Sequence, residues 1–220
     1  MSLLAGCGSA AVRGNDAHVA GPDPIVAQGG SIDRAQLRSA LAARRQQSLD
    51  RFLAYREGRV YPINTFDAGL QHVWRDDAGH LCAAATLISA DWGYEVAAAI
   101  GAENNFIRLA DVHEGPLWDW VLTSGLTHQE VVAIQEPMMR EPDVTTADPL
   151  EIARLYGIYT SVERQVRTMW DENLDAAVDA LMARPDLARA MLDGHVAAPG
   201  RFADAVARTE AAARVRAPGA

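Results

Sequence analysis

The sequence predicts a mainly α-helical protein: an irregular helical domain with a long helix and a small β-hairpin-like element near residues 70–80. Apolar residues recur at helical spacing through most of residues 31–194. Residues that favour helix starts and helix ends, such as Ser, Asp, Gly and Pro, bound these periodic segments. Patterns typical of strands are confined to a few short pieces.

Composition and the positions of Gly- and Pro-rich segments predict one domain with a tail at each end. The chain has 220 residues, of which 49% are hydrophobic and 22% are charged, as in an ordinary globular protein. Residues 1–30 are rich in Gly, Ala and Pro and are interpreted as a flexible tail. Residues 31–194 form the helical domain, with helical groups 31–136 and 148–194 joined by a Pro-containing linker. Residues 195–220 are expected to form a weakly packed, Ala-rich helix and tail.

The first helix is expected to begin after Ser31, a favourable N-cap, and to run to Glu57, with Gly58 ending it. Its apolar residues recur close to helical spacing, at Leu37, Leu41, Leu49, Phe52 and Leu53. Four arginines are assigned to the opposite face and interpreted as solvent-exposed: Arg38, Arg44, Arg45 and Arg51.

A short extended piece and two buried helices are expected next. Leu70–Arg75 alternates roughly between apolar and polar residues, and the turn-forming residues Asp76–Gly79 follow, which predicts a small hairpin. Cys82–Ala90 and Tyr94–Ile100 are apolar on nearly all sides, as is typical of buried helices. Asp91 is a suitable N-cap for the second of them.

The remaining helices are predicted from caps and periodicity. A helix is expected over Asp111–Ser124, and Thr127 with Glu130 forms a capping box for the helix after it. The longest helical pattern runs from Asp148 to about Ala183, although its apolar positions shift by one residue after Met169. We interpret it as one long helix of a bundle.

The charge pattern and the apolar runs exclude two classes of partner. The formal net charge is −9, and the basic residues, all of them Arg, are spread along the chain. Nucleic-acid binding needs a clustered basic surface. No apolar run approaches the ~20 residues that a membrane-spanning helix requires. No nucleic-acid partner, transmembrane span or cofactor is therefore predicted.

Residues Leu4-Ala5-Gly6-Cys7 resemble the lipobox of bacterial lipoproteins. In that family a signal segment is cut just before the Cys, whose thiol then carries a lipid, and a flexible tether follows. The resemblance implies lipidation of Cys7 and a lipid-anchored protein of the bacterial cell envelope. A secretory signal needs a charged start and an apolar stretch of roughly 7–15 residues, which Met1–Gly6 does not supply. The expectation therefore requires an incomplete N-terminus; otherwise a cytoplasmic location is expected.

Cys82 and His80 are the candidate catalytic residues. A Cys in the first turn of a helix is close to free backbone amides, which lower the pKa of its thiol. His80 is two residues away and is a candidate base, with Asp76, Asp77 or Asn64 to orient it. Free Cys is more often a small buried hydrophobe, and the following Ala83–Ala85 favours that structural role.

Three function classes remain open at this point. A non-enzymatic binding or structural module of unknown partner is the leading interpretation. The alternative is a thiol-dependent enzyme that uses Cys82 with His80. A second alternative is a metal-binding protein in which His72, His80 and Cys82 supply three ligands and the fold brings in His113, Glu114 or His128 as the fourth. The spacing of these residues matches no known zinc motif.

Overall fold

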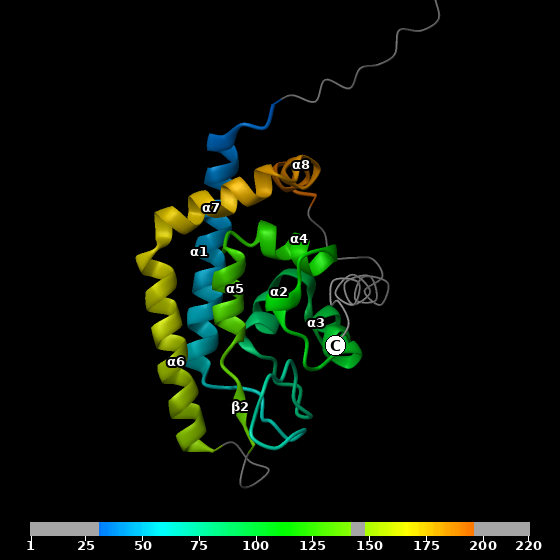
Figure 1. Ribbon diagram of the computed structural model, residues 1–220, viewed down its shortest axis with the longest axis vertical. Coiled ribbons are helices and arrows are strands. Elements are labelled where there is room, and N and C mark those ends of the chain that lie inside the picture. Colours follow the sequence, from blue (N-terminus) through cyan, green and yellow to red (C-terminus); the bar gives the residue numbers. More distant parts are fainter. Residues whose placement is uncertain (1–30, 142–147, 196–220) are drawn as a thin grey trace, which may run out of the picture. The chain divides into compact units, whose positions relative to one another are not determined.

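The computed structural model describes residues 31–141 and 148–195, and within these ranges it is mainly helical. The described part contains eight α-helices and one two-stranded antiparallel sheet, which confirms the predicted fold class (Figure 1). The chain divides into two compact units, Met1–Ser31 and Ile32–Ala220, and the elements described below belong to the second. The predicted N-terminal tail, including Cys7, and residues 196–220 of the predicted C-terminal helix and tail lie outside the described residues.

Helix α1 (Arg34–Gly58) is the element against which much of the second unit packs. It contacts α2, α6, α7 and α8, so it joins the two helical groups of the sequence analysis. The cap is Asp33 rather than the predicted Ser31: the Asp33 carboxylate accepts hydrogen bonds from the amides of Ala35 and Gln36. A carboxylate also interacts favourably with the positive end of the helix dipole.

The β-structure is small and forms in two places. Strand β1 (Leu70–Gln71) pairs antiparallel with β2 (Met139–Arg140), so the sheet joins segments far apart in the sequence. Next to it, Arg75 and Leu81 form a single antiparallel bridge that closes the turn between them. This bridged turn is the hairpin-like element predicted near residues 70–80.

Helices α2 (Ala83–Trp92) and α3 (Tyr94–Glu103) follow the bridged turn, as predicted. The assignment of Asp91 as the cap of the second helix was wrong. Asp91 lies inside α2, and Gly93, with a φ of 90°, caps α3 without a side-chain hydrogen bond. An L-residue with a Cβ rarely adopts such a φ, so the sharp change of direction between the two helices suits glycine.

The helix expected over Asp111–Ser124, in the middle of the chain, is shorter than the apolar periodicity predicted. Asp111 is the last residue of a 3₁₀ turn, η1 (Leu109–Asp111), and helix α4 (Gly115–Thr123) begins four residues later, with Pro116 in its first turn. The capping box before α5 (His128–Gln135) is confirmed, because the Glu130 amide donates to Thr127 Oγ1 and the Glu130 carboxylate accepts from the Thr127 amide.

The long helix predicted from Asp148 to about Ala183 is two helices. Helix α6 (Pro149–Thr168) ends at Met169, whose φ of −98° and ψ of 28° depart from helical values, and α7 (Trp170–Met182) begins there. In Figure 1, α6 lies beside α1 while α7 turns and crosses α1. The final described helix is α8 (Pro185–Leu192).

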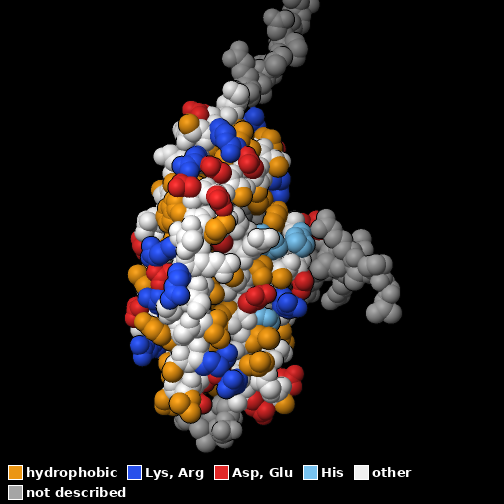
Figure 2. All heavy atoms as spheres, turned by 60° about the vertical axis from the view of Figure 1, so that its left-hand side comes forward, with side chains coloured by type: hydrophobic (Ala, Val, Ile, Leu, Met, Phe, Trp, Pro, Cys, Tyr) orange, Lys and Arg blue, Asp and Glu red, His pale blue; other side chains and the backbone are white. Residues whose placement is uncertain are grey.

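Two clusters of buried side chains hold these elements together. The larger involves α1, α2, α5 and α6, and it includes Trp74, Cys82 and Tyr159. The smaller lies between the first half of α1 and helices α7 and α8, with Leu37, Leu41, Leu174, Val178 and Leu181 at less than a few per cent exposure. On the face shown in Figure 2, basic and acidic side chains are interspersed rather than separated by sign. No helix within the described ranges is both long enough and apolar enough to cross a bilayer.

Candidate functional site

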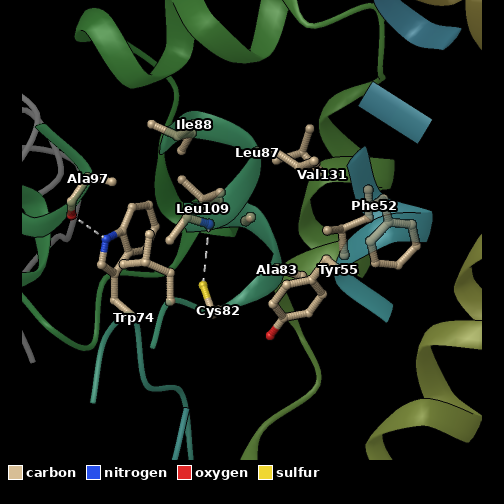
Figure 3. Packing of buried hydrophobic residues seen from close by; sticks show 14 of the residues in the cluster. Phe52, Tyr55, Trp74, Cys82, Ala83, Leu87, Ile88, Ala97, Leu109 and Val131 are labelled. Carbon is tan, nitrogen blue, oxygen red and sulfur yellow. Dashed lines mark hydrogen bonds between the residues drawn. The ribbon is translucent and has the colours of Figure 1, made fainter. Parts of the chain in front are cut away.

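Cys82 is at the predicted helix start but is buried. It is the N-cap of α2, is only 3% exposed, and its Sγ accepts a hydrogen bond from the Ala85 amide at 3.5 Å. Figure 3 shows the sulfur among the side chains of the core, near Trp74 and Leu109. Burial raises the pKa of the Cys82 thiol to about 12, and the backbone amides at the helix start offset only part of this effect. The thiol is therefore neutral at physiological pH.

His80 lies in a different environment from Cys82. Its side chain is 41% exposed, and its Nδ1 lies 2.9 Å from Oδ2 of the buried Asp76. Asp76, one of the predicted orienting residues, also accepts from the His80 and Ile63 amides. The Asp76 carboxylate thus stabilises the bridged turn and also fixes the orientation of the His80 imidazole. The other two predicted orienting residues bind elsewhere: Asn64 donates to loop carbonyls, and Asp77 accepts from Thr65.

The three-ligand metal site is not assembled. In the part of the chain that the structure describes, no group of three or more His, Cys, Asp or Glu side chains is placed to hold a metal ion. His72 is half-buried, and burial together with the nearby Arg108 lowers the pKa of its imidazole. His72, His80 and Cys82 are therefore separate side chains with separate partners.

In a Cys7→Ala background, native Cys82 is expected to react with iodoacetamide at least about a hundredfold more slowly than the same protein in urea. A thiol pKa near 12 reduces the thiolate fraction at neutral pH by roughly a thousandfold relative to an ordinary thiol, and burial blocks access as well. Mass spectrometry of timed samples measures both rates. Rapid alkylation of the native protein would instead favour the thiol-dependent enzyme.

A groove beside α1, which we call the Asp91 groove, is a concave site formed by described residues. Its volume is about 620 Å³, which is within the usual range of small-molecule sites. Four elements line it with a mixture of small, aromatic and polar side chains: Ala40, Ala43, Arg44 and Gln47 of α1, Asp91 and Trp92 of α2, Trp120 and Thr123 of α4, and Met191 and Gly194 at the end of α8.

The Asp91 carboxylate is the polar centre of this groove. Its Oδ2 accepts from Arg44 Nη2 at 2.5 Å and from the Trp120 indole at 2.8 Å, and its Oδ1 accepts from Arg51 Nη1 at 2.6 Å. Burial alone raises the pKa of Asp91, but the hydrogen bonds from Arg44 and Arg51 outweigh it, so the pKa lies below its ordinary value. The group of two arginines and one carboxylate carries an excess of one positive charge.

The prediction that four arginines of α1 are exposed was wrong for Arg45, which is buried. Arg44 and Arg51 are only partly exposed. Arg45 is fully buried and makes a bidentate ion pair with Glu130 of α5, at 2.7 and 2.5 Å. The side chains of Arg44 and Arg51 are 30% and 24% exposed because both bind Asp91. These charges are structural, and Arg44 also lines the groove.

The fold and the groove together define a mainly helical protein with an open, mixed polar and apolar groove beside its first helix. Comparison with protein-family models, with curated proteins and with solved structures found no match to this chain.

Proposed function

We propose that this protein is a non-enzymatic binding module and that the Asp91 groove is its binding surface. The observation that carries the proposal is the composition of the groove. Ala40 and Ala43 present a small-residue surface beside Trp92 and Met191, and the guanidinium of Arg44 borders it. Binding sites for small molecules combine this kind of apolar surface with a few fixed polar groups.

The groove suits a ligand with an apolar body and an anionic group. Arg44 lines the groove, and Asp91 holds it in place, so binding does not have to order it. Arg51 binds the other oxygen of Asp91, so the three side chains together keep one excess positive charge, and an anion is attracted to it. The rival thiol-dependent enzyme requires an opening that exposes Cys82, and the alkylation experiment decides between the two.

Ala43→Trp is expected to abolish binding of anilinonaphthalene sulfonate, an anionic aromatic dye, at the groove. Ala43 is exposed and lines the groove, so an indole there fills the space without disturbing the core. Ala54→Trp is the matched control, because Ala54 is exposed on the same helix and is not among the groove's lining residues. Dye fluorescence measures the dissociation constant. An unchanged value in Ala43→Trp, with the fold intact by circular dichroism, would contradict the proposal.

We extend the proposal to location: the module is tethered to a bacterial envelope through Cys7. Only the resemblance of Leu4-Ala5-Gly6-Cys7 to a lipobox supports this. The proposal requires an in-frame upstream segment with a basic start and an apolar stretch of roughly 7–15 residues. A genomic sequence without one contradicts the envelope location and leaves the groove unaffected.

A further inference from the structure

Three aromatic rings meet at the surface where η1, α4 and α5 come together. The ring centroids of His113 and His128 are 5.1 Å apart, with an interplanar angle of 80°. The Trp118 ring lies 4.9 Å from His128 and 5.8 Å from His113. His113 is exposed, and the other two are partly buried. None of the three lines the Asp91 groove.

One hydrogen bond determines which nitrogen of His128 is free. Its Nε2 lies 2.7 Å from the carbonyl oxygen of Leu109, and a carbonyl oxygen only accepts. The neutral ring therefore carries its proton on Nε2, and Nδ1 keeps its lone pair. Histidines that bind metals usually donate their other ring N–H to a carbonyl or carboxylate in this way, which fixes both the tautomer and the orientation of the ring.

The separation of the two rings matches a shared ion. Two imidazoles that bind one ion through nitrogens at about 2.0–2.1 Å, in tetrahedral or octahedral geometry, hold their ring centroids about 4.5–5 Å apart. The observed 5.1 Å is close to this separation, and ligation further requires that a ring nitrogen of His113 turn toward Nδ1 of His128. His113 is exposed, and exposed side chains change rotamer within nanoseconds, so it is free to make that adjustment.

We propose that His113 and His128 together bind one transition-metal ion of the Ni²⁺, Cu²⁺ or Zn²⁺ class. Imidazole nitrogen suits these ions and does not suit Mg²⁺ or Ca²⁺. The exposed carboxylates of Asp111 and Glu114 flank His113 in the sequence and add negative charge, which offsets the positive end of the α5 dipole at His128. With two protein ligands and water completing the coordination, the ion exchanges with solvent. The site differs from the three-ligand set of His72, His80 and Cys82.

The probe is Ni²⁺ alone, titrated calorimetrically into the full chain in a non-chelating buffer at about pH 7.5, because protons compete with the metal for ring nitrogens at lower pH. His113→Asn is expected to raise the apparent dissociation constant at least about tenfold, because loss of a mere supporting group already costs 10–100-fold. His195→Asn and His18→Asn are the matched controls and should leave it unchanged. Paramagnetic Ni²⁺ should also broaden the indole N–H resonance of Trp118.

Each outcome of this experiment is decisive. His113 is exposed, so His113→Asn is expected to fold, and it carries the test even where His128→Asn loses its bond to Leu109 and unfolds. Absence of Ni²⁺ binding in the unmodified chain overturns the proposal, as does binding that survives His113→Asn. Loss of binding in a histidine control with retention in His113→Asn places the ion elsewhere and overturns it as well.

Discussion

Replacement of Arg45 by methionine is expected to lower the free energy of unfolding by about 3–5 kcal/mol, because it leaves a buried carboxylate without its partner. The Arg45 guanidinium is fully buried and binds both carboxylate oxygens of Glu130. It also donates to the carbonyl oxygens of Gly125 and Val166, at 3.1 and 3.0 Å, and lies over the Trp170 ring. One side chain of α1 thus binds the loop before α5, α5 itself and α6.

Urea unfolding followed by circular dichroism measures this loss. The control is Arg167→Met, which removes an ion pair between residues four apart on α6 and is expected to cost about 0.5 kcal/mol or less. Its partner Glu163 keeps a second arginine, Arg56, so no charge is left unpaired. Equal losses in Arg45→Met and Arg167→Met would show that burial of the pair has no special cost.

A double variant separates the pair from its surroundings. Glu130→Gln removes the charge that Arg45→Met leaves unpaired, so the double variant should be more stable than the sum of the two single losses predicts. Recovery should be incomplete, because the Glu130 carboxylate also accepts from the Thr127 amide and from Asn173. Strict additivity would argue against a coupled pair.

The buried position of Arg45 is visible in the sequence once residue type is set aside. Leu37, Leu41, Ser48 and Phe52 lie on the buried stripe of α1, and position 45 is four residues after 41, on the same stripe. The charge of the side chain led to the opposite assignment. The partner was also predicted, but only as a cap: Glu130 serves the α5 capping box and binds Arg45 with the same carboxylate. Local sequence shows the first role, and only the tertiary fold shows the second.

The break between α6 and α7 at Met169 also has a signal in the sequence. The apolar positions of the predicted long helix shift by one residue at the place where α6 ends and α7 begins. The raised pKa of the Cys82 thiol, in contrast, has no signal in the local sequence. The place of this residue at a helix start was predicted correctly, but its pKa depends on desolvation by residues distant in the sequence, so the local amides do not decide it. The Asp91 groove was missed for the same reason, because its lining comes from four separate helices.

Gly125→Ala is expected to destabilise the protein by roughly 3–5 kcal/mol, through backbone strain and steric overlap together. Gly125 has a φ of 78°, which residues with a Cβ rarely adopt. A Cβ there would lie 2.5 Å from the Leu41 carbonyl oxygen and 2.8 Å from the Cα of Arg45, and it would also overlap the Arg45 amide. These are backbone atoms of α1, so no side-chain rotation relieves the overlap.

The same substitution at Gly157 should have the opposite sign. Gly157 lies inside α6, and a Cβ there meets nothing within 4 Å, so Gly157→Ala is expected to stabilise the protein by about 0.5–1 kcal/mol through helix propensity. Because the Gly125 carbonyl also accepts from Arg45, displacement of the loop should weaken the Arg45–Glu130 pair, and Gly125→Ala and Arg45→Met should be less than additive. If Gly125→Ala unfolds at the midpoint of the unmodified protein, the close approach of the α4–α5 loop to α1 is not required for stability.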